Sequence, residues 1–193
     1  MKKLLLYLCL IVLIVLGVIA YNYNQHVTLP NVASTPAPWQ PTRLRIPRMG
    51  IDTNVISVGT TPSGQMDAPV SKAINSPYWT SVFWYGPGAA PGQAGNAVIA
   101  GHVDRVGGDP AVFWSLDTLK VGDPIFVTTG HKDTLKFVVE RVVHYSADAS
   151  SDEVLNAVFG STTEHHLNLI TCSGVWTGQG YDQRLVVFTT QVS

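Results

Sequence analysis

Cys172 and Arg184 are the two residues whose types and spacing could do chemistry together. Alternation over 167–171 and a β-branched and aromatic run over 185–190 predict two neighbouring strands, joined by a Gly-rich loop over 173–180. Cys172 stands where the first strand is expected to stop, and Arg184 stands where the second is expected to begin. A thiol beside a guanidinium could serve as a nucleophile with a group that stabilises a developing oxyanion.

His102 is the residue expected to act as the base or acid for such a thiol. It directly follows the apolar strand predicted over 96–100 and lies between a glycine and a turn. The other five of the six histidines lie in a linker, at a hairpin tip, at a strand end or side by side at 165–166, and we expect them to be inert. A zinc site needs closely spaced cysteine and histidine ligands, so we expect no metal and no cofactor.

Each of these residues also has an ordinary structural interpretation. A free cysteine such as Cys172 is often a small buried hydrophobic residue. A strand arginine such as Arg184 is usually a surface charge. Asp104 and Arg105 could form an ion pair beside His102, which would give Asp104 a supporting role rather than a chemical one.

The composition limits the class of protein. The 193 residues are enough for one domain with a hydrophobic core and attached segments. Only 13% of the residues are charged and the net charge is -1, so the sequence offers no basic surface for nucleic acid. Cys9 lies in an apolar N-terminal run and cannot pair with Cys172, so no disulfide is expected.

The N-terminus is typical of a membrane anchor. Lys2 and Lys3 precede residues 4–20, which carry no charge. Signal-peptide cores run about 7–15 residues whereas a bilayer span takes about 17–25, so the length favours an uncleaved signal-anchor over 1–20. Val18 and Ala20 leave cleavage by a signal peptidase open as the alternative. The positive-inside rule then predicts a single-pass protein of the cell membrane with an extracytoplasmic domain.

The remaining chain predicts one β-domain. Residues 21–41 are rich in Pro, Asn, Ser and Thr and indicate a linker, and we expect the folded domain over 42–193. Apolar and β-branched patterns predict short strands over 43–46, 54–58, 96–100, 124–128, 135–144, 167–171 and 185–190, with one helix over 150–159. Many short strands with one or two short helices favour an all-β closed or nearly closed barrel.

These residues resemble a known family. The run Leu169-Ile170-Thr171-Cys172, the upstream Ala100-Gly101-His102, and Arg184 before the strand 185–188 are together similar to the sortases, membrane-anchored cysteine transpeptidases of mostly Gram-positive bacteria. The resemblance covers residues 42–193, and Gly101-His102-Val103-Asp104 is most similar to classes F and E. Asn168 departs from the family pattern, which has threonine there. The resemblance implies a closed eight-stranded sortase β-barrel.

The resemblance also implies a reaction. Cys172 would attack the Thr–Gly carbonyl of an LPxTG-like sorting signal, and His102 would protonate the leaving amine. Arg184 would stabilise the oxyanion. An amine acceptor, either a cell-wall peptide or a pilin, would then resolve the thioester.

Thr171 and Ser173 flank the cysteine and are expected to contact the substrate.

Two alternatives stay open beside this reaction. If water instead of an amine resolves the acyl-enzyme, the protein is an extracytoplasmic cysteine peptidase. If Cys172 does not react, the protein is a non-catalytic wall-binding β-domain.

Overall fold

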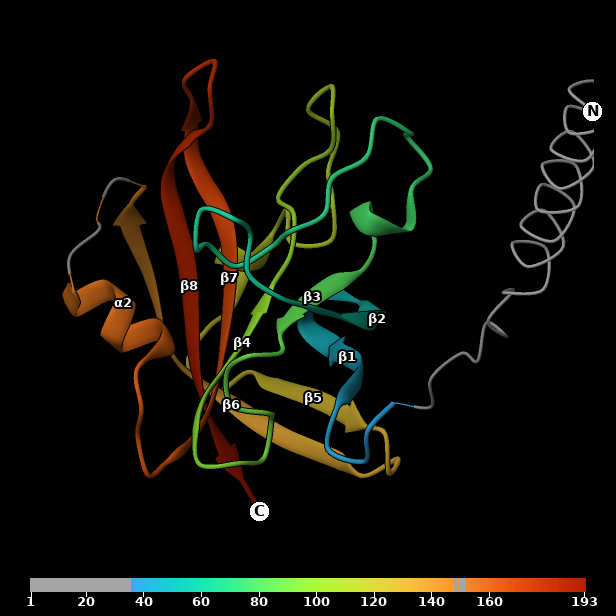
Figure 1. Ribbon diagram of the computed structural model, residues 1–193, viewed down its shortest axis with the longest axis vertical. Helices are drawn as coiled ribbons and strands as arrows, with labels where there is room; N and C mark the ends of the chain where they lie inside the picture. Colours follow the sequence, from blue (N-terminus) through green and yellow to red (C-terminus); the bar gives the residue numbers. More distant parts are fainter. Residues whose placement is uncertain (1–35, 148, 150–151) are drawn as a thin grey trace, which may run out of the picture. The chain divides into compact units, whose positions relative to one another are not determined.

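Eight strands pair edge to edge until the first meets the fifth, so the sheet closes into a barrel (Figure 1). The computed structural model describes residues 36–147, 149 and 152–193. The strand order around the barrel is β1-β2-β3-β4-β7-β8-β6-β5. This confirms the expected all-β class and the closed eight-stranded barrel. The strands are β1 (Pro41–Ile46), β2 (Ile51–Val58), β3 (Val82–Tyr85), β4 (Gly95–Ala100), β5 (Pro124–Thr129), β6 (Thr134–Ser146), β7 (His165–Trp176) and β8 (Tyr181–Val192).

Helices are few and short. The helix predicted over 150–159 is observed as α2 (Asp152–Phe159), while residues 150–151 lie outside the described residues. Three 3-10 turns complete the described helical structure: η1 (Pro47–Met49), η2 (Pro77–Trp79) and η3 (Leu116–Thr118). Within the part of the chain that the structure describes, no helix is long and apolar enough to cross a membrane, and the predicted anchor over 1–20 lies outside that part.

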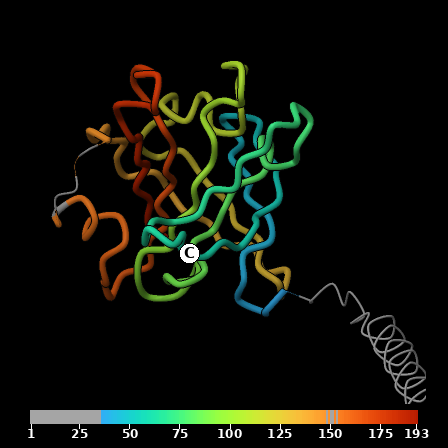
Figure 2. The backbone as a smooth tube through the Cα atoms, turned by 45° about the horizontal axis from the view of Figure 1, so that its top comes forward, coloured from blue at the N-terminus to red at the C-terminus, as the bar shows by residue number. Residues whose placement is uncertain are grey.

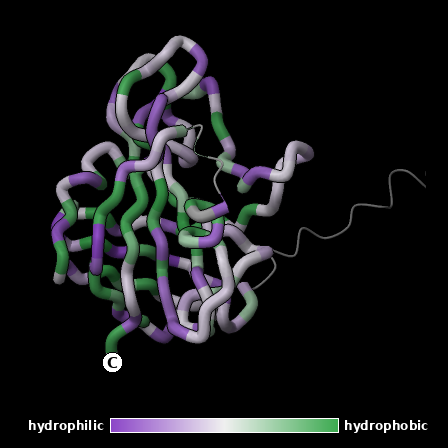
Figure 3. The backbone as a smooth tube through the Cα atoms, turned by 90° about the vertical axis from the view of Figure 1, so that its left-hand side faces the viewer, coloured by the Kyte–Doolittle hydropathy of each residue, from purple (hydrophilic) through white to green (hydrophobic). Residues whose placement is uncertain are grey.

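Two apolar clusters explain the burial pattern of the strands. The larger cluster fills the barrel and includes Trp84, Phe113 and Phe137. The smaller cluster joins α2 to the outer face of β4 and β8 through Val98, Val158 and Val186 and neighbouring side chains. Strands that are covered on both faces lose their alternation and become continuous apolar runs, as β8 does over 185–188. Hydrophobic segments accordingly run along the strands of the barrel (Figure 3).

Asn168, the residue that departs from the family pattern, connects α2 to the barrel. Its side chain is fully buried, and its Nδ2 donates hydrogen bonds to the Val158 carbonyl, at 2.8 Å, and to Asn96 Oδ1, at 3.2 Å. Asn96 Nδ2 in turn donates to the Gly160 carbonyl at 2.7 Å. The two amides therefore hold the C-terminal end of α2 against β4 and β7.

The chain just before β1 contacts the barrel. Trp39 packs edge-on against Trp84 with ring centroids 5.9 Å apart. The amide of Gly130 donates to the Gln40 carbonyl, and that of His131 donates to the Pro38 carbonyl. The domain start at residue 42 stays a prediction, and the described contacts extend it to residue 38 at least.

Strands β7 and β8 are longer than the sequence suggested. We expected the first strand to stop before Cys172 and a loop to occupy 173–180, but β7 continues to Trp176 and the connection spans only 177–180. The glycines were misleading because Gly174, at φ +83°, forms a bulge inside the strand. Asp182 Oδ1 accepts the Val175 amide at 2.7 Å across this bulge. Cys172 and Arg184 thus lie inside paired strands.

Asn168→Ala should lower the stability of the domain because it leaves buried carbonyl groups without donors. We expect a loss of about 1–3 kcal/mol in the free energy of unfolding. Thermal or urea unfolding followed by circular dichroism would measure it.

Asn156→Ala provides the matched control, since Asn156 lies on the same helix with an exposed side chain. A surface substitution of this kind should change the free energy by no more than about 0.5 kcal/mol. Equal stabilities of the two variants would contradict the proposed connection between α2 and the barrel.

Candidate active site

Cys172 and Arg184 face each other across two hydrogen-bonded strands. The antiparallel register of β7 and β8 pairs the Cα atoms of Cys172 and Arg184 directly. Residues in such a pair project to the same face of the sheet, with Cβ atoms about 4.5–5.5 Å apart. The structure therefore brings together the two residues that the strand pattern predicts to be neighbours.

His102 reaches the other side of Cys172 through the parallel pairing of β4 and β7. Ala100 pairs with Ile170, so two further residues along each chain bring His102 level with Cys172. The Gly101 amide donates to the Ile170 carbonyl at 3.1 Å and so continues the ladder past the strand end. Cys172 is consequently flanked by His102, just past the end of β4, and by Arg184 on β8.

Aromatic side chains and a backbone carbonyl hold the imidazole of His102. Its ring centroid lies 5.0 Å from that of Trp79 and 5.4 Å from that of Phe83. His102 Nε2 lies 2.8 Å from the carbonyl oxygen of Pro69. Because a carbonyl only accepts, Nε2 carries the proton in this arrangement and Nδ1 is the nitrogen that can accept one.

Gly101 lets the barrel core reach the backbone next to His102. A β-carbon at position 101 would overlap the ring of Phe113, which is fully buried. The amide of Phe113 also donates to the His102 carbonyl at 2.9 Å. The position of the imidazole is therefore tied to the packing of the core.

Thr171 supports this arrangement. Its hydroxyl is buried and donates to the Gly101 carbonyl at 2.8 Å. The hydroxyl is thus committed to a structural bond between β7 and the residue before His102. Ser173 lies nearer the surface, with its Oγ 3.4 Å from His144 Nδ1. Both of these residues, which we expect to contact substrate, line the smaller cleft, and the hydroxyl of Thr171 is the one bonded to the backbone.

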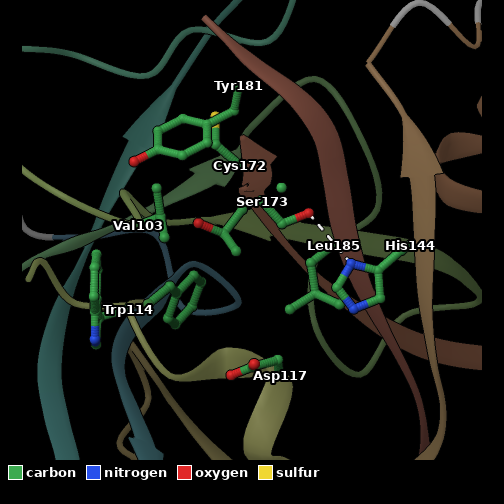
Figure 4. A pocket seen from close by; sticks show the side chains of 11 residues that line it. Val103, Trp114, Asp117, His144, Cys172, Ser173, Tyr181 and Leu185 are labelled. Atoms are coloured by element: carbon green, nitrogen blue, oxygen red, sulfur yellow. Dashed lines mark hydrogen bonds between the residues drawn. The ribbon is translucent and has the colours of Figure 1, made fainter. Parts of the chain in front are cut away.

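Two clefts meet at Cys172, at the barrel end where the β7–β8 connection, the loop after β4 and the 59–81 segment gather (Figures 1 and 2). The larger has a volume of about 690 Å³ and contains His102 and Asp104. The smaller, of about 250 Å³, contains Asp117, His144 and Ser173 (Figure 4). Cys172, Val103 and Tyr181 line both clefts and form the boundary between them.

Tyr181 is a site residue that the sequence analysis missed. Its ring stands beside the sulfur of Cys172 (Figure 4). Its hydroxyl donates a hydrogen bond to Asp104 Oδ2 at 2.6 Å. This bond, with smaller effects of burial and nearby negative charge, raises the pKa of Tyr181 to about 12. The tyrosine therefore stays protonated as a donor to Asp104.

Asp104 does not form the ion pair that we considered. Its carboxylate accepts from Tyr181, while the guanidinium of Arg105 donates to the carbonyls of Pro110 and Ile74. Among the salt bridges of the described residues there is no Asp104–Arg105 pair. Asp104 and Arg105 both line the larger cleft, the carboxylate bonded to the Tyr181 hydroxyl and the guanidinium to backbone carbonyls.

Burial and two neighbouring charges of opposite sign act on the pKa of the Cys172 thiol. Burial raises its pKa, the positive charge of Arg184 acts to lower it, and the negative charge of Asp104 acts to raise it further. The net effect is a raised pKa, because desolvation disfavours the thiolate. The thiol therefore needs a base at the moment of reaction, and His102 is the neighbouring group of that kind.

The guanidinium of Arg184 is oriented by backbone carbonyls. Its Nη1 donates to the carbonyl oxygens of Tyr181, at 3.0 Å, and Gln183, at 2.9 Å. One edge of the planar group is thereby fixed, and its other N–H groups are the ones available to a substrate. In the described residues, no group of three or more His, Cys, Asp or Glu side chains is arranged to hold a metal ion.

Comparison with known proteins identifies the class. A family model described as the sortase domain matches residues 44–192, so the chain belongs to the sortase family. It is accordingly a cysteine transpeptidase. A search of curated proteins found no match.

Solved sortase structures share the fold at low sequence identity. A sortase D5 transpeptidase of Clostridium perfringens is 21% identical, with a TM-score of 0.56 over 80% of this chain and 79% of that one. A pilus-related sortase C of Group B Streptococcus is 15% identical, with a TM-score of 0.58 over 82% and 70%. Sortase A of Corynebacterium diphtheriae is 20% identical, with a TM-score of 0.57 over 80% and 61%. The fold is common to these classes, and assignment to class F or E stays a prediction.

Alkylation of Cys172 should report the charges around it. The rate of reaction with iodoacetamide should rise with pH along a curve displaced to the alkaline side of an ordinary thiol, because its pKa is raised. Asp104→Asn removes a charge that disfavours the thiolate and should move the curve to lower pH. Arg184→Gln removes the opposing charge and should move it to higher pH. Mass spectrometry of the adduct at a series of pH values gives the rates.

Asp117→Asn is the control for this experiment. Asp117 lines the smaller cleft, and its charge is not among those that shift the pKa of Cys172. Its curve should coincide with that of the wild type. If the Asp104→Asn curve also coincided with it, the electrostatic influence of Asp104 on the thiol would be disproved.

Proposed function

We propose that this protein is a sortase of the cell membrane that cleaves an LPxTG-like sorting signal between Thr and Gly and joins the released protein to an amine. The acceptor amine belongs to a cell-wall peptide or to a pilin. The placement of Cys172 between Arg184 and His102, fixed by strand pairing on both sides, is the observation that carries the proposal.

The first half-reaction forms a thioester. His102 takes the proton of Cys172, and the sulfur attacks the carbonyl carbon of the threonine. Arg184 donates hydrogen bonds to the oxyanion of the tetrahedral intermediate. When the C–N bond breaks, the proton on His102 passes to the leaving amine of the glycine. The raised pKa of Cys172 supports this route, since the resting group is a thiol.

The cellular setting rests on the N-terminal sequence. Lys2, Lys3 and the uncharged residues 4–20 support a single membrane span with the barrel on the extracytoplasmic side. Sorting signals and wall acceptors are displayed on that side. The pilus-related sortase C among the similar structures is the reason to keep a pilin beside the wall peptide as acceptor.

Cys172→Ala should abolish the acyl-enzyme while leaving the melting temperature nearly unchanged, since the thiol supplies the attacking atom. An LPxTG-like peptide is incubated with each protein, with and without triglycine, and products and adducts are identified by mass spectrometry. A transpeptidation product with the wild type supports the proposal. Hydrolysis alone, even with triglycine present, would instead favour the peptidase, and continued turnover by Cys172→Ala would exclude this residue as the nucleophile.

Arg184→Lys should lower the turnover number heavily although it keeps the positive charge. The planar fork of arginine is fixed by two carbonyls, whereas the lysine ammonium is a point charge on a flexible stem. Losing one oxyanion donor costs about 10²–10³ in turnover, and the effect on KM should be smaller. Steady-state kinetics on the same peptide decides. Turnover near that of the wild type would remove Arg184 from the reaction.

A further inference from the structure

We propose that the larger cleft is the amine side of the active site, and that Asp104 binds the ammonium group of the acceptor there before it attacks the thioester. The inference rests on the proposed transpeptidation, because it assigns the second substrate of that reaction to a particular surface. Two substrates must reach one sulfur, and the structure offers two clefts that meet at Cys172.

The position of His102 decides which cleft takes the amine. The acid that protonates the leaving amine becomes the base that deprotonates the entering one, so both amines occupy the same place beside it. His102 lines the larger cleft and does not line the smaller one. The acyl chain is then left to the other side of Cys172, toward Ser173 and Leu185 in the smaller cleft.

The charge in the larger cleft suits a cationic partner. Asp104 lines it with a carboxylate that Tyr181 holds in place through a 2.6 Å hydrogen bond. Arg105 also lines this cleft, but its guanidinium donates to the carbonyls of Pro110 and Ile74 and not to Asp104. Primary amines of peptides and lysine side chains are largely protonated near neutral pH, and a carboxylate that is not ion-paired with its neighbouring arginine can attract them.

Asp104 has a cost in the first half-reaction, because its negative charge adds to the raised pKa of Cys172 and so disfavours the thiolate. A carboxylate with this effect is expected to help in another step. Attraction of the acceptor in the second half-reaction is such a step. By that stage the sulfur is acylated and carries no charge for Asp104 to disfavour.

The rim of the cleft indicates that the amine arrives on a peptide. Val70, Val106 and Trp176 are 72%, 69% and 59% exposed and line the cleft from three separate segments. Exposed apolar side chains in the same cleft as Asp104 fit an acceptor that has apolar surface beside its amine.

The chemical step balances with groups already named. The bound ammonium loses one proton to solvent, and the amine nitrogen forms a bond to the thioester carbonyl carbon. His102 takes the second proton as the new amide forms. The C–S bond breaks, and the proton on His102 returns to the sulfur of Cys172, which restores the resting thiol.

The test loads Cys172 with an acetyl group so that it does not depend on the sorting motif. Full-length protein is treated with p-nitrophenyl acetate, with Cys172→Ala as the background. The acetyl-enzyme then partitions between hydrolysis by water and transfer to an added amine, which is either triglycine, whose amino group is largely protonated near neutral pH, or hydroxylamine, which is neutral. We expect Asp104→Asn to reduce transfer to triglycine, relative to hydrolysis, by about tenfold, as for one lost charged contact. In the same variant, transfer to hydroxylamine relative to hydrolysis should fall by much less than transfer to triglycine does.

Asp133→Asn is the matched control, because it makes the same change at an exposed residue of the β5–β6 hairpin that lines neither cleft. Its partition between triglycine and water should equal that of the wild type. The proposal is overturned if Asp104→Asn partitions like the wild type, if Asp133→Asn loses as much transfer to triglycine as Asp104→Asn, or if hydroxylamine and triglycine are affected equally. An acetyl-enzyme that transfers normally while an LPxTG-like peptide is left uncleaved would refute the proposed sorting signal alone.

Discussion

The hydrogen-bond ladders on the two edges of β7 are the constraint on which the site depends. The parallel ladder to β4 sets the position of His102, and the antiparallel ladder to β8 sets the position of Arg184. A slip of one residue in either ladder would turn Cys172 or its partner to the opposite face of the sheet. Closure of the barrel and burial of β7 and β8 on both faces make such a slip costly.

The electrostatics of the site show that its groups do not all favour the same step. Burial and Asp104 disfavour the thiolate of Cys172, while Arg184 favours it. A group that is buried for precise placement loses hydration, and a neighbouring cation recovers only part of that loss. The resulting neutral thiol is compatible with a histidine that moves protons in both halves of a transfer reaction.

The sequence was informative where local pattern and strand pairing coincide. The runs around 167–171 and 185–190 predicted adjacent strands, and this adjacency was enough to place Cys172 beside Arg184. The bulge at Gly174 was not predictable, because a glycine at positive φ inside a strand has the same local signature as a loop. The contact between Tyr181 and Asp104 joins residues 77 positions apart, one in β8 and one in the loop after β4, and no periodic pattern encodes it. The clefts likewise arise only when distant loops meet.

The absence of a side chain at Gly101 has a consequence for the evolution of the molecule. Phe113 belongs to the barrel interior, and its ring occupies the space that a β-carbon at position 101 would need. Gly101, next to His102, and Phe113, in the barrel core, are therefore in direct contact. A larger residue at position 101 would require a smaller one at position 113, so the two positions cannot change independently. Selection for stability and selection for activity therefore act on the same contact between Gly101 and Phe113.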